Sequence, residues 1–131
     1  MSDIPGAGGA FLSPAIWRAR IFNGEWIASK GGALVFTEPA TGEQLGRIGL
    51  ANAADVLAAG VQARAAQKAW AKSDYKERAA IFRRAAIMIA QNHDEMSTWI
   101  VRETGAIRPK ADLELREATS HLQEAAAMTC T

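Results

Sequence analysis

The sequence has little of several features that mark specialised proteins. It contains one cysteine, Cys130, which excludes an internal disulfide and a metal site built on several cysteines. Its two histidines, His93 and His121, are far apart in the sequence and have no neighbour at metal-ligand spacing. A net charge of +1 is too small for the field of a nucleic-acid binder, and no apolar run approaches the ~20 residues that span a bilayer. We therefore expect a cytoplasmic protein with no nucleic-acid and no membrane partner.

The common phosphate-binding and nucleophile motifs are also absent. No G-x-G-x-x-G, G-x-x-x-x-G-K-[ST] or G-x-S-x-G pattern occurs, and the glycines of residues 6–9 neither follow a predicted strand nor open a capped helix. Cys130 is the penultimate residue, with no predicted structure around it to activate a thiolate or form an oxyanion hole. The patterns therefore assign no catalytic, cofactor-binding or metal-binding residue.

The first part of the chain predicts a leader and two small strand pairs. Residues 1–15 are rich in Gly and Ala, so we expect a flexible leader, with ordered structure from about Ile16. Apolar residues flank Asn23-Gly24, a pair that favours a tight type I′ hairpin turn. Residues 34–37 and 44–50 read as two further short strands around a turn with Pro and Gly. Two such hairpins need helices packed on them to be stable.

Residues 73–105 are the most regular part of the chain and predict two helices that meet at a bend near residues 92–94. At 100° per residue, one face of the first helix is apolar and contains Ala79, Phe82, Ala86, Ile89 and His93. Ile81 and Met88 add a second apolar strip. We therefore expect this helix to contact two neighbouring elements.

Residues typical of helix ends mark four helices after residue 51. Asn52 and Asp55 can form an approximate capping box for a helix with a stripe of small residues, which reaches Trp70. The other three helices have cap residues, proline or glycine at their ends, namely Ser73 or Asp74, Asp94, Gly105 and Pro109. The apolar stripe of the last helix continues to the end of the chain without a stop signal, which is typical of a chain cut inside a larger domain.

Charged side chains on these helices have ordinary explanations. Arg78, Arg83 and Arg84 form a basic patch that could touch phosphates, but Glu77 and the lack of exposed aromatic residues favour a solvated or ion-paired face. His93, at a helix end on an apolar face, is typical of a packed structural histidine. Three more carboxylates read as helix-surface residues, and these are Glu103, Glu114 and Glu117.

Four stretches together resemble the N-terminal segment of the NAD(P)-dependent aldehyde dehydrogenase superfamily. They are FNGEW at 22–26, EPATGEQLGRI at 38–48, NAADVLAAGVQARAAQKAW at 52–70 and ERAAIFRRAAIMIAQNHDEMSTWIVRETG at 77–105. The hairpins and the stretch YKERAAIFRRAA are most similar to benzaldehyde or aromatic-aldehyde members. The chain departs from the family at Glu38, where Asn is frequent, and at Ala106, where Lys often follows the glycine.

The resemblance implies an α/β, aldehyde dehydrogenase-like fold. This chain would hold only the N-terminal β-hairpins and about four helices that flank the dinucleotide-binding domain. In these terms, residues 16–131 are an incomplete N-terminal part of the NAD(P)-binding domain. The family's cysteine nucleophile, glutamate base, oxyanion-stabilising asparagine and cofactor-contacting residues lie beyond the matched part, and Cys130 is not in the family's cysteine motif.

The implied function is the N-terminal part of an enzyme that oxidises an aromatic aldehyde to the carboxylic acid with NAD or NADP. The complete enzyme would be a homo-oligomer, whereas we expect this chain alone to be inactive and to bind no cofactor. The alternative is a non-catalytic helical interaction module, or a truncated regulator that binds a partner subunit. The resemblance also suggests a structural monovalent cation near Thr37 and Glu114, although a surface glutamate is the simpler reading of Glu114.

Overall fold

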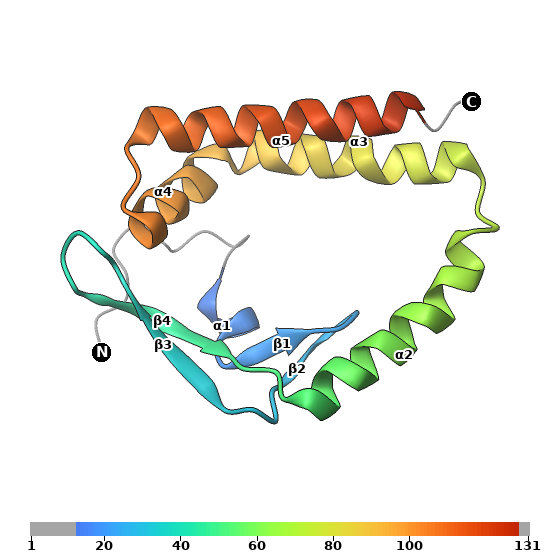
Figure 1. Cartoon of the computed structure of the whole chain (residues 1–131). Helices are drawn as coiled ribbons and strands as arrows, with labels where there is room; N and C mark the ends of the chain where they lie inside the picture. Colours follow the sequence, from blue (N-terminus) through green and yellow to red (C-terminus); the bar gives the residue numbers. More distant parts are fainter. Residues whose placement is uncertain (1–12, 129–131) are drawn as a thin grey trace. The chain divides into compact units, whose positions relative to one another are not determined.

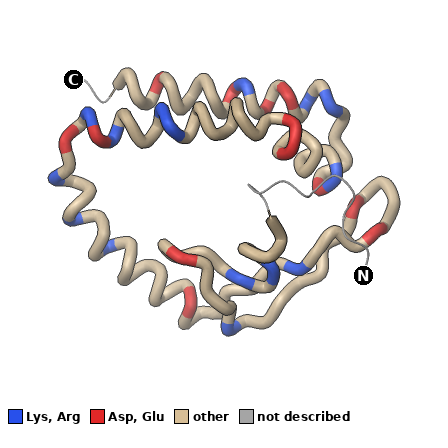
Figure 2. The backbone as a smooth tube through the Cα atoms, turned by 180° about the vertical axis from the view of Figure 1, so that it is seen from behind, with Lys and Arg blue, Asp and Glu red and all other residues tan. Residues whose placement is uncertain are grey.

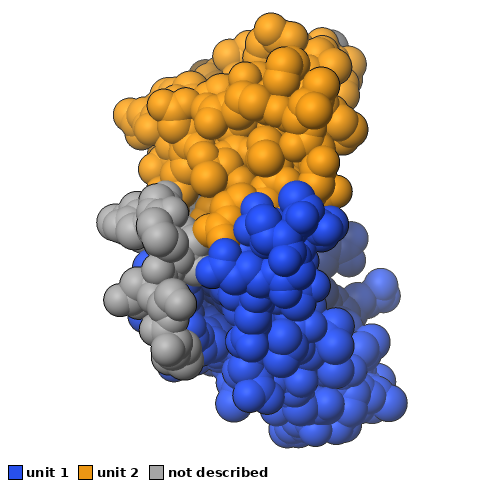
Figure 3. Space-filling model, turned by 90° about the vertical axis from the view of Figure 1, so that its left-hand side faces the viewer, with its two compact units in different colours: residues 1–72 blue, residues 73–131 orange. Residues whose placement is uncertain are grey.

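The computed structural model describes residues 13–128. The chain forms two compact units, residues 1–72 and residues 73–131 (Figure 3). The described part of the first unit contains α1 (Pro14–Trp17), β1 (Arg20–Phe22), β2 (Trp26–Ala28), β3 (Ala33–Thr37), β4 (Gln44–Gly49) and α2 (Ala53–Trp70). The described part of the second unit contains α3 (Tyr75–Gln91), α4 (His93–Thr104) and α5 (Arg108–Met128) (Figure 1).

Strands β1 and β2 form the first predicted hairpin, but its turn differs from the predicted one. Phe22 pairs with Trp26, so the loop has three residues, and Gly24 alone among them has a positive φ, 110°. The predicted type I′ turn is therefore wrong, because that turn has two central residues, both with positive φ. Glu25 is the additional loop residue. The Phe22 and Trp26 rings pack edge to face with centroids 5.3 Å apart.

Strands β3 and β4 form the second predicted hairpin, a separate two-stranded antiparallel sheet. Leu45 is buried on this sheet. Gly46 is also buried, because the ring of Trp17 from α1 packs against Phe36 over it, with ring centroids 6.0 Å apart. A Cβ at position 46 would lie 2.9 Å from the Trp17 ring and 3.0 Å from the Phe36 ring. A side chain at this position would therefore require one of the rings to shift.

The sequence patterns did not predict α1. It is a single turn with Pro14 at its first position, and it raises the number of helices between residues 13 and 128 from the expected four to five. A segment this short has no periodicity to detect, and its contact with the β3–β4 hairpin comes from Trp17. Residues 1–12 lie outside the described residues, so the flexible leader over residues 1–15 stays a prediction, as does the domain assignment of residues 16–131.

A buried carboxylate fixes the start of α2. The predicted capping box is confirmed, since the Asp55 amide donates to Asn52 Oδ1 at 2.9 Å and the Asn52 amide donates to Asp55 Oδ2 at 3.2 Å. Asp55 Oδ2 also accepts a hydrogen bond from the Lys30 amide at 2.9 Å, which ties the loop before β3 to the helix. Beyond Asp55 the helix is largely exposed, including Trp70 at the end of its stripe of small residues.

In the second unit, α3 and α5 run side by side in opposite directions, and α4 lies at the end where α3 finishes and α5 begins (Figure 1). The core between these helices is made mainly of alanine. Its buried apolar residues are Ala79, Ala86, Ala111, Leu115 and Ala126. The apolar face predicted for residues 79–89 is thus the face that α3 turns to α5, while the second strip, Ile81 and Met88, is exposed.

The predicted helix ends in this unit are mostly confirmed. The side chain of Asp74 accepts from the Lys76 amide at 2.9 Å, and Gly105 ends α4 with a φ of 71°. The exception is the start of α4, which lies at His93 rather than at Asp94. Asn92 is both the C-cap of α3 and the N-cap of α4. Its side-chain amide donates to the Met88 carbonyl of α3 and does not cap α4.

Replacing Asp55 with alanine should destabilise the first unit. The backbone amides of Asn52 and Lys30 both donate to the Asp55 carboxylate and would lose this buried acceptor. The loss should lower the free energy of unfolding by about 1–3 kcal/mol. Urea unfolding followed by circular dichroism measures the loss. Arg64→Ala, at an exposed position on the same helix, is the control and should change stability by less than about 0.5 kcal/mol. Equal stability of Asp55→Ala and wild type would contradict the proposed role of the carboxylate.

Replacing Ala86 with leucine should destabilise the second unit. The added side chain must enter the closely packed face between α3 and α5, and overpacking of this kind costs about 1–3 kcal/mol. Ala90→Leu is the matched control, because Ala90 is exposed on the same helix. Equal shifts of the urea midpoint in both variants would show that the packing at Ala86 has room for a larger side chain.

Candidate functional site

The densest cluster of polar side chains in the described residues lies where α4 meets the start of α5. The Ser97 hydroxyl, fully buried on α4, donates to Asp112 Oδ1 on α5 at 2.8 Å. Arg108 donates from Nε to the same oxygen at 3.0 Å and from Nη2 to Asp94 Oδ1 at 2.6 Å. The two ring nitrogens of His93 lie 3.6 Å from Asp94 and Asp112, one nitrogen from each carboxylate.

The surroundings of Asp112 favour its charged form. The hydrogen bond from Ser97 lowers the pKa of this carboxyl most, and the hydrogen bond and positive charge of Arg108 lower it further. Partial desolvation raises the pKa of Asp112, but by less than these interactions lower it. Asp112 is therefore a charged anchor for two helices and not a general acid.

The cluster has the properties of a structural joint. One arginine bridges two carboxylates. Ser97 is fully buried, and the lowered pKa of Asp112 makes that carboxylate a weak base, so neither accessibility nor basicity favours a serine nucleophile here. Asp112, Ser97 and Arg108 were not predicted as site residues from the sequence. The i, i+4 spacing of Arg108 and Asp112 was the available signal, whereas the Ser97 contact joins residues fifteen positions apart.

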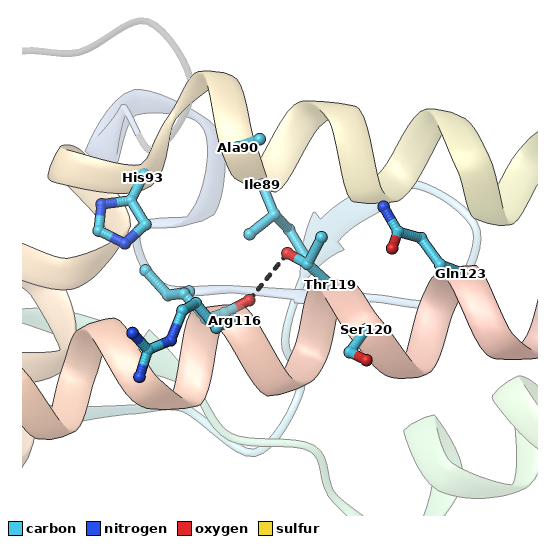
Figure 4. A pocket seen from close by; sticks show the side chains of 8 residues that line it. Ile89, Ala90, His93, Arg116, Thr119, Ser120 and Gln123 are labelled. Atoms are coloured by element: carbon cyan, nitrogen blue, oxygen red, sulfur yellow. Dashed lines mark hydrogen bonds between the residues drawn. The ribbon is translucent and has the colours of Figure 1, made fainter.

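A shallow hollow of about 270 Å³ lies beside this cluster (Figure 4). Residues of α3, α4 and α5 line it, namely Ile89, Ala90, His93, Leu115, Arg116, Thr119, Ser120 and Gln123. The Thr119 hydroxyl donates to the Leu115 carbonyl of its own helix at 2.8 Å, so it is not directed at a ligand. The His93 nitrogens face Asp94 and Asp112. We find no convergent set of polar groups in this hollow, which a binding site normally has.

Residues 26–130 match the aldehyde dehydrogenase family. The chain belongs to this family. It is 43% identical over 119 residues to vanillin dehydrogenase of an Amycolatopsis species, which covers 91% of this chain and 24% of that enzyme. It is 41% identical over 113 residues to the NAD(+) benzaldehyde dehydrogenase of Pseudomonas putida, which covers 86% of this chain and 23% of that enzyme.

A solved structure gives the same assignment. The crystal structure of an NAD-dependent benzaldehyde dehydrogenase from Corynebacterium glutamicum superposes with a TM-score of 0.81 and 29% identity, over 92% of this chain and 26% of that one. The expected aldehyde dehydrogenase-like fold and the similarity to aromatic-aldehyde members are thereby confirmed. The chain spans about a quarter of the length of these relatives. The comparisons give no support to a separate helical interaction module.

The arginine patch suggested by the sequence of this aldehyde dehydrogenase chain does not form a uniform basic surface. Arg78 Nη1 donates to the Ser73 carbonyl at 2.6 Å, while Arg83 and Arg84 are exposed. Along α3 the single acidic residue, Glu77, lies among basic ones, whereas α5 carries residues of both signs (Figure 2). His121 and two of the glutamates, Glu103 and Glu117, are exposed on helix surfaces. Cys130 lies outside the described residues.

The two positions suggested for a structural cation lie in different units. Thr37 ends β3, and Glu114 lies on α5, where its carboxylate pairs with Lys110 one helical turn earlier. Within residues 13–128 there is no group of three or more His, Cys, Asp or Glu residues that could hold a metal ion. The cation near Glu114 stays a prediction, with Lys110 as a competing partner for the carboxylate.

Three helix N-termini in the described part of the chain carry carboxylates, which disfavour a bound pyrophosphate. A pyrophosphate is bound at a helix N-terminus with free amides and no acidic neighbour. Here the first turns or caps of α2, α3 and α4 carry carboxylates, whereas the first turn of α5 has no acidic residue. The carboxylates are Asp55, Asp74, Glu77, Asp94 and Glu95. The strands form antiparallel hairpins and not the parallel sheet of a dinucleotide fold. No helix of the described part is long and apolar enough to cross a bilayer.

Acid should weaken the joint between α4 and α5 in a specific pH range. Because the pKa of Asp112 is lowered in the folded chain, its charge adds stability above the unfolded aspartate value of about 3.9, and this contribution disappears as pH falls through the lower folded value. Asp112→Asn should remove this part of the pH dependence. Urea midpoints measured from neutral to acid pH test the expectation.

The matched control for this titration is Glu117→Gln, an exposed position on the same helix. That variant should keep the acid dependence of the wild type. A pH profile of Asp112→Asn identical to the wild-type profile would show that Asp112 does not anchor the two helices.

Proposed function

We propose that this chain forms the N-terminal part of an NAD(P)-dependent aldehyde dehydrogenase subunit that oxidises an aromatic aldehyde to the carboxylic acid. The observation that carries the proposal is the identity of 43% and 41% to vanillin and benzaldehyde dehydrogenases over 91% and 86% of the chain. Both enzymes are named for an aromatic aldehyde. The crystal structure from Corynebacterium glutamicum, also of a benzaldehyde dehydrogenase, supports the same substrate class.

The role of this chain in such an enzyme is to build the scaffold. It supplies two hairpins and a helical unit, and it contributes no catalytic, cofactor-binding or metal-binding side chain. The redox cofactor accepts a hydride from the aldehyde, and the groups that hold it belong to the rest of the subunit. NAD is favoured over NADP, because two of the similar enzymes are named for it. The complete enzyme is a cytoplasmic homo-oligomer in this proposal.

A chimera tests the function. In it, this chain replaces the matching 119-residue segment of the Amycolatopsis vanillin dehydrogenase. It should oxidise vanillin and benzaldehyde with NAD within about tenfold of the parent rate, a loss of about 1.4 kcal/mol in transition-state stabilisation. NADH absorbance measures the rate, and the 131-residue chain alone should give no signal above background.

Two results would contradict the proposal. One is turnover of benzaldehyde by the chain alone, which would place catalytic groups within these residues. The other is a folded chimera that binds NAD but oxidises no aromatic aldehyde. The control is the same chimera with Asp55→Ala, which should lose stability while the substrate preference stays unchanged.

A further inference from the structure

The loop of the β1–β2 hairpin holds the pair Asn23-Gly24, in which a side chain and the next backbone amide can react with each other. Asn23 is half-buried, while Gly24 and Glu25 are exposed. Asparagine is among the thermolabile residues of proteins. A following glycine makes it more reactive, because glycine has no Cβ to hinder the attack of its own amide nitrogen on the asparagine side chain.

The reacting groups of this pair are not held by other parts of the described structure. The Asn23 backbone amide donates to the Glu25 carbonyl at 3.2 Å, but the Gly24 amide has no acceptor within residues 13–128. The side chain of Asn23 has no hydrogen-bond partner in the same range. A Cβ placed on Gly24 would have no atom within 4 Å, so the loop is open around the attacking nitrogen.

The other two asparagines of the chain are held in place. Asn52 Oδ1 accepts from the Asp55 amide at 2.9 Å, and Asn92 Nδ2 donates to the Met88 carbonyl at 2.8 Å. Each of the two is followed by a residue with a Cβ that opens a helix. These asparagines therefore serve as internal controls for Asn23.

We propose that Asn23 is a site of spontaneous deamidation. Hydroxide removes the proton of the Gly24 amide, whose nitrogen attacks Cγ of Asn23, and the side-chain nitrogen leaves as ammonia. Water then opens the succinimide ring. Cleavage of the bond from the ring nitrogen to Cγ gives aspartate, and cleavage of its bond to the backbone carbonyl carbon gives isoaspartate. A water molecule is consumed and an ammonia molecule is released, without oxidation or reduction.

Both products change the hairpin. Each places a negative charge in the same loop as Glu25, and isoaspartate also adds a CH₂ group to the backbone of the loop. Loop length sets the register of a hairpin, which here pairs Phe22 with Trp26. Isoaspartate at position 23 should therefore loosen the pairing of β1 with β2, which faster amide hydrogen exchange over residues 20–28 would report.

Incubation of the 131-residue chain at mildly alkaline pH tests the site directly. Peptide mass spectrometry measures the conversion of each asparagine to its acid. Asn23 should convert at least about tenfold faster than Asn52 or Asn92, since only Asn23 precedes glycine. Its rate should rise in proportion to the hydroxide concentration. Equal rates at the three asparagines would overturn the proposal.

The same measurement in urea shows whether the folded hairpin permits the reaction. The folded chain should deamidate at Asn23 within about tenfold of the unfolded rate, because the loop leaves both reacting groups unpaired. If Asn23 stays intact in the folded chain but reacts in urea, the hairpin keeps the two groups apart and the proposal fails.

Two variants locate the chemistry. Asn23→Gln keeps an amide and Gly24 but lengthens the side chain, so labelling by protein isoaspartate methyltransferase should disappear; label that persists would place the reaction elsewhere. Gly24→Ala should slow conversion at least about tenfold, because it adds a Cβ beside the attacking nitrogen. This variant is measured in urea, since alanine at a φ of 110° would strain the folded loop. A wild-type rate in Gly24→Ala would contradict the role of the glycine.

Discussion

Two helices approach closely only where the side chains between them are small, and the second unit depends on this constraint. Alanines at 79 and 86 of α3 and at 111 and 126 of α5 are buried in its core. Close packing through small residues has a cost, because each alanine removes little apolar area from water. Of the larger apolar residues of α3, Phe82 and Ile89 are half-buried, while Ile81, Ile87 and Met88 are exposed. In this arrangement α3 is suited to the interior of a larger fold.

One buried polar group in each unit secures a joint that apolar packing alone would leave loose. Asp55 connects the start of α2 to the loop before β3, and Ser97 connects α4 to Asp112 on α5. In both cases the buried group is paired, so its burial is tolerated, and the pairing permits one arrangement of the elements rather than several. This property suits a scaffold whose task is to present surfaces at fixed positions within each unit.

The elements that local chemistry determines could be predicted from the sequence. The Asn52–Asp55 box, the Asp74 cap and the glycine at 105 act within one turn of helix, and the structure has all three. Contacts between distant residues were not accessible in this way, including Lys30 with Asp55 and Ser97 with Asp112. The family followed from several stretches in the right order. A catalytic site could not follow, because the patterns that announce one are absent from these residues.

The glycine beneath the Trp17 and Phe36 rings links three parts of the first unit that are far apart in the sequence. A Cβ at position 46 would lie 2.9 Å from the Trp17 ring and 3.0 Å from the Phe36 ring. The two rings pack over the backbone of β4 at this glycine. Positions 17, 36 and 46 are thus coupled by packing. We expect a side chain at position 46 to displace the ring at 17 or 36 and so to loosen the attachment of α1 to the sheet.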